Sequence, residues 1–274
     1  AGGKQLFDWA CQRKVPIPVF AEMSSVNPVF LLPGKMKESA VEIAQMYAGS
    51  ITLGVGQFCT NPGLLIGIEG PELRQFILSL SEAIRLVVPG EMLHTGIFKN
   101  YVETRANVLA QPATEMIAVA DAAPQHGQGA ATIAAVAAAD FIGNPLLHRE
   151  VFGPYSLVIR CKDEKEMLEV ALHLEGQLTA TLMASVEDVK NNTELVEAVK
   201  NICGRIILNG VPTGVEVCKS MQHGGPFPAT TDSRFGAVGA DAIKRFVRPL
   251  SFQNWPEELL PDELKSDSPL LTKQ

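Results

Sequence analysis

No apolar run in the sequence is long enough to cross a membrane, because glycine, proline or charge interrupts each one short of the roughly 20 residues that a spanning helix requires. The N-terminus has no basic stretch followed by an apolar one, so we expect no secretion signal. Lysine and arginine form no cluster, and the net charge of -7 argues against nucleic acid or an anionic membrane as the main partner. We therefore expect a soluble cytoplasmic protein.

Cysteine is also scarce. The five cysteines form no CxxC pair and no cysteine–histidine spacing of a zinc site, so the sequence predicts no metal site. Their odd number and scattered positions suit a reducing compartment better than a disulfide framework. The chain has no initiator methionine and opens with AGGKQLFDWACQ, as though midway through a helix. We expect a fragment or a processed product of a longer protein.

Patterns of helices and strands alternate along the chain, which at 274 residues is long enough to bury a large core. Between Pro71 and Val87, apolar residues recur every three or four positions, and Pro71 suits a first helical turn. The other helical patterns cover residues 4–13, 38–49, 163–174 and 186–202. The strand patterns cover residues 64–68, 129–140, 177–185 and 205–209, although the alanines of residues 129–140 also favour a helix. This alternation predicts an open α/β sheet with helices on both faces.

The stretch GVGQFCTNPG, residues 54–63, places Cys59 on a loop, since glycine and proline on both sides interrupt any regular element. A packing cysteine usually lies within an apolar run, whereas loops on a rigid scaffold often display reactive groups. Two interpretations stay open here, a reactive thiol or a structural cysteine in a tight turn.

Three other side chains have the chemistry of a catalytic site, and each has a structural alternative. Glu22 ends the apolar segment VFAEM, either as a solvated strand end or as a half-buried general base with a raised pKa. Glu150 precedes the turn VFGP and either caps it or has a functional role. His223 lies on a loop of glycine and proline, where a single histidine is more often a surface residue than a catalyst. Their combination and order along the chain, rather than any one of them, indicate function.

Five motifs in order, AEMSSVNP, GQFCTNPG, EVFGP, NGVPTGVEV and HGGPFPATTDSRFGAVG, resemble the catalytic half of the NAD(P)-dependent aldehyde dehydrogenases. The sequence is most similar to the branch that oxidises 2,5-dioxopentanoate, also called α-ketoglutarate semialdehyde. The resemblance implies an aldehyde dehydrogenase-like catalytic domain of α/β class, with the nucleotide-binding domain largely absent. It also implies an oxidoreductase that uses NADP or NAD, with NADP favoured.

The resemblance assigns roles to individual residues. Cys59 matches the nucleophile, which adds to the aldehyde to give a thiohemiacetal and, after hydride transfer, a thioester. Glu22 matches the general base that activates the hydrolytic water. Glu150 matches the residue that holds the ribose next to the nicotinamide, and Phe152 would lie beside the nicotinamide itself. The backbone N–H of Cys59 is expected to form half of an oxyanion hole.

Other residues match segments that wall the aldehyde tunnel of the family. They are Phe58, Thr60, Asn209, Val211, Pro212, Thr213 and His223. The cations of these loops are Lys219 and Arg234, either of which would suit the carboxylate of a semialdehyde or lie in solvent. Ser24 stands where the family usually has a glycine, and we expect Ser24 to adopt a negative φ.

The resemblance also divides the chain into three parts. Residues 1–22 are expected to be a remnant of the nucleotide-binding domain, residues 23–245 the catalytic domain, and residues 246–274 an oligomerisation strand with a C-terminal tail. The stretch FVRPLSFQ contains Pro249, which confines it to a sheet edge that can pair with another chain, so we expect a homo-oligomer. Without the nucleotide-binding half, the chain is expected to be inactive.

Two other functions stay open. A cysteine hydrolase would use Cys59 and Glu22 to cleave an ester or thioester, and such activity would persist without any cofactor. A binding or assembly module would keep the fold and have no chemistry.

Overall fold

The computed structural model describes residues 2–270. The chain forms two compact units, residues 1–242 and residues 243–274. Residue 1 and residues 271–274, the outermost parts of the predicted remnant and tail, lie outside the described residues. In the described part of the chain, each helix is too short or too polar to cross a bilayer.

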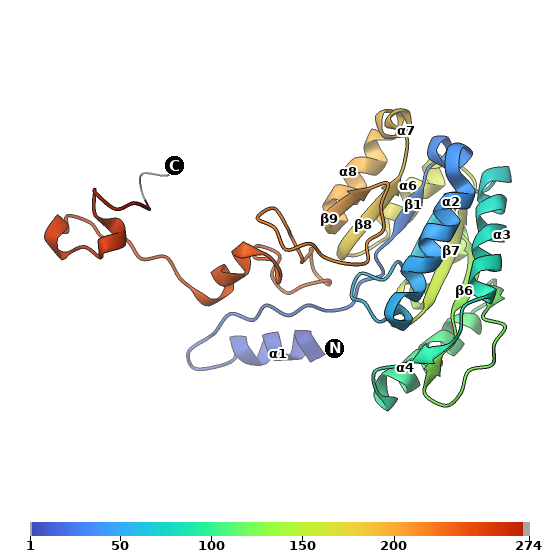
Figure 1. Cartoon of the computed structure of the whole chain (residues 1–274), viewed down its shortest axis with the longest axis horizontal. Coiled ribbons are helices and arrows are strands. Elements are labelled where there is room, and N and C mark those ends of the chain that lie inside the picture. The colour runs from blue at the N-terminus through green and yellow to red at the C-terminus, as the bar shows by residue number, and fades with distance from the viewer. Residues whose placement is uncertain (1, 271–274) are drawn as a thin grey trace. The chain divides into compact units, whose positions relative to one another are not determined.

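The first unit contains the helices and strands of the chain (Figure 1). The helices are α1 (Gly2–Cys11), α2 (Pro33–Thr52), α3 (Pro71–Arg85), α4 (Thr95–Leu109), α5 (Ala138–Gly143), α6 (Glu164–Leu172), α7 (Val186–Asn191) and α8 (Thr193–Ile202). The strands are β1 (Val29–Leu31), β2 (Leu64–Ile68), β3 (Gly90–Glu91), β4 (Glu115–Val119), β5 (Gln128–Gly129), β6 (Thr132–Ala137), β7 (Tyr155–Cys161), β8 (Gln177–Met183) and β9 (Cys203–Leu208).

Seven strands form one sheet in the order β4-β6-β7-β2-β1-β8-β9. All neighbours in this sheet are parallel except β4, which runs antiparallel to β6 at one edge. The strands β3 and β5 form a separate antiparallel pair. The predicted open α/β sheet is confirmed, and its parallel strands require the crossover helices that the alternating pattern indicated.

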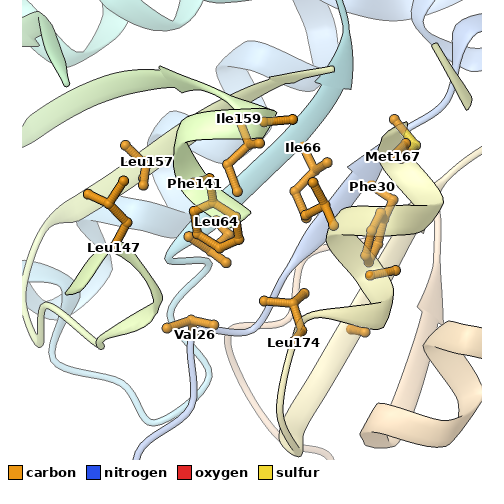
Figure 2. Close-up of a cluster of buried hydrophobic side chains, with 14 of the residues drawn as sticks. Val26, Phe30, Leu64, Ile66, Phe141, Leu147, Leu157, Ile159, Met167 and Leu174 are labelled. Carbon is orange, nitrogen blue, oxygen red and sulfur yellow. The ribbon is translucent and has the colours of Figure 1, made fainter. Parts of the chain in front are cut away.

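The sheet is covered by helices on both faces, and each face carries its own apolar cluster. Phe30 of β1 packs with residues of α5, α6 and α8, and Figure 2 shows it in this cluster with Ile66, Phe141 and Met167. Val29 and Leu31, its neighbours in the strand, point to the opposite face and pack with α2 and α3. Strands buried on both faces read as continuous apolar runs, which is why VFL and LLIGI have no polar alternation.

The structure differs from the predicted elements at several places. The segment 186–202 is two helices, because Asn192 leaves the helical conformation with φ -116 and ψ 47. The strand expected over residues 129–140 covers only residues 132–137, and its last alanines begin α5. Helix α2 is longer at both ends than the predicted segment 38–49. Strands β1, β3, β4, β5 and β7 and helix α4 were not predicted.

The second unit begins within the 3₁₀ helix Ala240–Phe246 and contains two further short 3₁₀ turns, Glu257–Leu259 and Asp262–Leu264. Residues 247–253, where an edge strand was expected, form neither helix nor strand in this single chain. A strand at this place requires the backbone of a neighbouring chain, so the oligomerisation strand stays a prediction.

Candidate active site

Glu22 is positioned by an extended segment that lies antiparallel to residues 229–231. The backbone N–H of Met23 donates to the carbonyl of Ala229 at 2.8 Å, and that of Thr231 donates to the carbonyl of Ala21 at 3.0 Å. Glu22 itself bridges with Thr230 in this pairing. The pairing joins the predicted general base to the loop that carries the motif HGGPFPATT.

Cys59 lies in a turn between the 3₁₀ helix Leu53–Gly56 and β2, as the glycines and prolines around it predicted. Gly54, Val55 and Gly56 all have a positive φ, of 55°, 58° and 64°. A Cβ on Gly56 would come within 2.3 Å of the backbone of Gly153, so only glycine fits this position. The Cys59 residue is partly exposed.

The buried side-chain amide of Asn27 holds the turn that carries Cys59. Its Nδ2 donates to the carbonyl oxygens of Cys59 at 2.9 Å and Asn61 at 3.0 Å. Its Oδ1 accepts from the hydroxyls of Ser25 at 2.8 Å and Thr179 at 3.0 Å. Asn27 therefore connects the segment that carries Glu22 to the turn that carries Cys59, and the sequence analysis gave it no role.

Replacing Asn27 with aspartate is expected to lower the free energy of unfolding by about 3 kcal/mol, because a buried carboxylate would face two carbonyl oxygens. Asparagine and aspartate both tolerate the φ of 45° at this position, so backbone strain does not contribute. Urea denaturation would measure the loss. Asn254→Asp, at an exposed asparagine with φ 55°, is the matched control and should leave stability nearly unchanged.

The fold brings the side chains of Glu22, Cys59 and His223 together. The Nε2 atom of His223 lies 3.1 Å from Oε2 of Glu22 and 3.5 Å from Sγ of Cys59. The functional atoms of all three lie within 4.8 Å of one another. The His223 side chain is only 5% exposed, whereas that of Glu22 is 31% exposed. Sequence reasoning placed His223 on the substrate tunnel, and the geometry puts it in direct contact with the sulfur and the carboxylate.

These contacts raise the pKa of His223 to about 9. The hydrogen bond with Cys59 contributes most, the hydrogen bond with Glu22 comes next, and burial opposes both. The other ring nitrogen, Nδ1, is buried and has no hydrogen-bond partner among the described residues. Both contacts therefore involve Nε2. This arrangement favours a proton on Nε2, from which the N–H can donate to the sulfur of Cys59 or the carboxylate of Glu22.

Glu150 lies close enough to Glu22 for their charges to interact. Burial raises its pKa to about 7; hydrogen bonds from the Ser24 side chain and the Ser25 backbone lower the pKa, while the charge of Glu22 raises it. Glu150 and Phe152 line a small cavity of about 20 Å³ together with Ser25 and Asn61. Both residues predicted to meet the nicotinamide end of a cofactor therefore border one space.

Ser24 adopts the backbone conformation expected for it. It is not among the non-glycine residues with positive φ in residues 2–270, which are Asn27, Val55, Ala113, Asn209 and Asn254. A serine is therefore accommodated without left-handed strain. Its hydroxyl bonds Glu150, a contact that a glycine would not make.

A cation that sequence reasoning missed lies near Cys59. Burial lowers the pKa of the guanidinium of Arg205 on β9, and the charge of the nearby Cys59 opposes this shift. Its Nη2 donates to the carbonyl of Pro212 at 2.9 Å, and its Nε is buried with no partner in the described part of the chain. Arg205 belongs to the strand RIIL rather than to a tunnel loop, so its position gave no signal. The alternatives, Lys219 and Arg234, have no recorded contact with Cys59, and Arg234 pairs with Asp232.

The other predicted tunnel residues make contacts within the scaffold. Asn209 exchanges two hydrogen bonds with the backbone of Ala184, at 2.8 and 2.9 Å. The Thr213 hydroxyl lies 2.9 Å from that of Ser50 on α2, and Val211 packs on the cluster that α2 and α3 cover. Thr60 is buried beside Cys59. The ring of Phe58 packs over Gly54.

The chain is similar in sequence to curated proteins along nearly all of its length. It is 44% identical over 269 residues to alpha-ketoglutaric semialdehyde dehydrogenase 2 of Azospirillum brasilense, and 44% identical over 270 residues to alpha-ketoglutaric semialdehyde dehydrogenase of Acinetobacter baylyi. Each alignment covers 98% of this chain and 51% of the relative, so the chain spans about half the length of the curated relatives it matches. No protein-family model matches the chain.

Solved structures share the fold at lower sequence identity. The gamma-glutamyl-gamma-aminobutyraldehyde dehydrogenase of Burkholderia cenocepacia aligns with 89% of this chain and 48% of its own, with a TM-score of 0.71 and 18% identity. Proline utilization A of Bdellovibrio bacteriovorus aligns with 91% of this chain and 26% of its own, with a TM-score of 0.74 and 20% identity. At these identities the likeness concerns the fold alone.

Proposed function

Because the chain belongs to the aldehyde dehydrogenase superfamily, we propose that it is the catalytic portion of an enzyme that oxidises an aldehyde to a carboxylic acid with NAD(P). The observation that carries this proposal is the contact of one buried imidazole with both the sulfur of Cys59 and the carboxylate of Glu22. This contact joins a nucleophile, a proton carrier and a base in one place.

The first half of the reaction is addition of the Cys59 sulfur to the aldehyde carbonyl. A proton held on Nε2 of His223 stabilises a thiolate on Cys59, because the N–H donates to the sulfur and adds a positive charge beside it. The thiolate forms a bond to the carbonyl carbon, and the carbonyl electron pair moves to oxygen. The backbone N–H of Cys59 would donate to that oxygen, so the thiohemiacetal forms as its alkoxide.

The second half is hydrolysis of the thioester that remains after the hydride has left. Glu22 is 31% exposed, so water can reach its carboxylate, which takes a proton as the water oxygen attacks the acyl carbon. The carbon–sulfur bond then breaks and the acid leaves. His223 stabilises the departing thiolate, and Glu22 then releases to solvent the proton that it took from the water, which restores the starting cluster.

The residues at the site fit the nicotinamide end of NAD(P). A carboxylate is an acceptor with two oxygens, and hydrogen bonds from Ser24 and Ser25 only partly offset the desolvation of the half-buried Glu150. Ribose hydroxyls would supply further donors to it, and Phe152 offers an apolar ring beside them. When bound, NAD(P) accepts the hydride from the thiohemiacetal carbon. A preference for NADP over NAD is part of the proposal.

The substrate that we propose is 2,5-dioxopentanoate or a similar semialdehyde. The relatives with 44% identity are named as alpha-ketoglutaric semialdehyde dehydrogenases. Arg205 supports an anionic substrate, since it is a half-buried cation close to Cys59 with an unpaired N–H. The residues proposed to line the aldehyde path are Phe58, Thr60, Asn209, Val211, Pro212 and Thr213.

The assembly that we propose follows the division of the chain. Residues 1–22 would belong to the nucleotide-binding domain, residues 23–245 to the catalytic domain, and residues 246–274 to a strand and tail that pair with a second copy. A homo-oligomer in the cytoplasm stays a prediction. The apolar side chains that support pairing are exposed in this region, among them Val247, Leu250 and Phe252.

Kinetic assay of the full-length gene product tests the proposal. With 2,5-dioxopentanoate and NADP or NAD, reduced cofactor should accumulate, and kcat/KM should exceed that for an uncharged aldehyde of similar length because Arg205 meets the carboxylate. An absence of cofactor reduction with every short aldehyde would contradict the oxidation. Equal kcat/KM for charged and uncharged aldehydes would show that Arg205 does not recognise the substrate carboxylate. This result would not contradict the proposed oxidation.

A second candidate function is hydrolysis of an ester or thioester without a cofactor. The observation that favours it is that the three side chains needed for acylation and hydrolysis are all present in this chain. Cleavage of p-nitrophenyl acetate by the 274-residue chain, lost in Cys59→Ala, would support it.

A further inference from the structure

We propose that Cys59, His223 and Glu22 bind one Zn²⁺ ion, which blocks the nucleophile reversibly. The sequence predicted no metal site because these three residues lie far apart along the chain. The fold brings their donor atoms within 4.8 Å of one another. The inference that zinc inhibits the enzyme rests on the proposed function. The inference that zinc binds at these residues does not.

The two separations that involve Nε2 of His223 are close to those that tetrahedral zinc requires. Zinc binds thiolate sulfur at about 2.3 Å and imidazole nitrogen or carboxylate oxygen at about 2.1 Å, so tetrahedral angles place sulfur and nitrogen about 3.6 Å apart and nitrogen and oxygen about 3.4 Å apart. In the structure Sγ of Cys59 lies 3.5 Å from Nε2 of His223, and that nitrogen lies 3.1 Å from Oε2 of Glu22. An ion would enter with shifts of a few tenths of an ångström between these pairs.

The charges and the exposure of the site also suit a divalent cation. A thiolate and a carboxylate together offset the two positive charges of the ion, and the charge of Glu150 acts in the same direction because it interacts with Glu22. Arg205 opposes binding, since it lies near Cys59. Glu22 and Cys59 are both partly exposed, so a hydrated ion can reach them from solvent.

Two features set this site apart from a structural zinc site. It has three protein donors, which leaves the fourth position to water. When Nε2 binds zinc, the proton of His223 must sit on Nδ1, which is buried and has no partner among the described residues. Binding releases one proton from the pair of Cys59 and His223, with no change of oxidation state. We therefore expect a reversible site that is weaker than a structural one.

The test is alkylation of Cys59 by iodoacetamide in the 274-residue chain, with and without zinc chloride, followed by mass spectrometry of the peptide that contains Cys59. At a zinc concentration about ten times the dissociation constant, alkylation of Cys59 should slow by about tenfold, and EDTA should restore the rate. Titration calorimetry should give one equivalent of zinc bound at this site. Each variant is compared with itself with and without zinc, so a change in the intrinsic reactivity of the thiol does not affect the ratio.

His223→Ala and Glu22→Gln provide the decisive comparison. The ratio of rates without and with zinc should fall to near one in His223→Ala and decrease in Glu22→Gln, while far-UV circular dichroism confirms that both variants fold. His126→Ala, at an exposed histidine in the turn before β5, is the matched control and should keep the ratio of the unchanged chain. Full protection in His223→Ala, or an absence of protection in the unchanged chain, would overturn the zinc site. Neither outcome bears on aldehyde oxidation, which the kinetic assay tests separately.

Discussion

Replacing Cys59 with alanine in the full-length gene product is expected to lower kcat for aldehyde oxidation by about four orders of magnitude or more, because no other group near the site forms the acyl intermediate. The turn that carries Cys59 is held through backbone carbonyls by Asn27, so loss of the sulfur leaves the turn in place. The measurement is the initial rate of formation of reduced cofactor at saturating aldehyde. Thermal unfolding of the same variant should match that of the unchanged protein within a few degrees.

Cys11→Ala is the control for this experiment, since Cys11 is an exposed thiol on α1 and should leave kcat unchanged. Residual oxidation above about one hundredth of the original rate in Cys59→Ala would show that the covalent route is not used. Esterase activity that disappears together with oxidation would place both reactions at the same sulfur.

Replacing His223 with alanine is expected to slow alkylation of Cys59 by about 10- to 100-fold near pH 6.5, because the variant lacks the positive charge that His223 places 3.5 Å from the sulfur. The pKa of His223 is raised to about 9 by Cys59 and Glu22, so its charge is present below that pH and is lost above it. The difference between the variant and the unchanged chain should therefore shrink as pH rises from 7 towards 10. The measurement is the alkylation rate of the Cys59 peptide across this range.

The shape of the profile separates two roles for the imidazole. If His223 only packs against its neighbours, His223→Ala changes the rate by the same factor at every pH. If its charge activates the sulfur, the ratio of the two rates is large below pH 8 and falls above it, as the imidazole loses its proton. His126→Ala, whose ring lies on an exposed turn, should react like the unchanged chain at every pH. A ratio that does not depend on pH would contradict this role of His223.

Local sequence signals predicted those helices and strands whose first and last residues are marked by proline, glycine or a change from apolar to polar residues. Helix α3 begins at Pro71 as predicted, and β2 covers LLIGI. Strand β1 was missed because it is only Val29–Leu31, and β7 was missed because no turn residue separates it clearly from the charged stretch after it. The alanines of residues 129–140 support both a strand and a helix, and the structure contains both.

The candidate site was predicted as a set of residues but not as a geometry. Gly56 and Pro62 placed Cys59 on a loop and left a reactive or a structural thiol open, and the residue is partly exposed. The contact of His223 with Cys59 spans 164 positions of sequence, so no local pattern indicates it. Asn27 and Arg205 were missed for the same reason, because their importance arises from partners on other strands.

The parallel sheet has a consequence for how the reacting groups are spaced. Glu22 precedes β1, Cys59 precedes β2 and Glu150 precedes β7, and these strands are consecutive neighbours that run in the same direction. The three groups therefore lie at the amino ends of the strands. The spacing of about 4.8 Å between neighbouring strands sets the separation of the groups. Insertion or deletion of one residue in any of the three segments that precede these strands would displace its side chain relative to the other two. Insertions or deletions at the carboxyl ends of the strands would leave the positions of the three side chains unchanged.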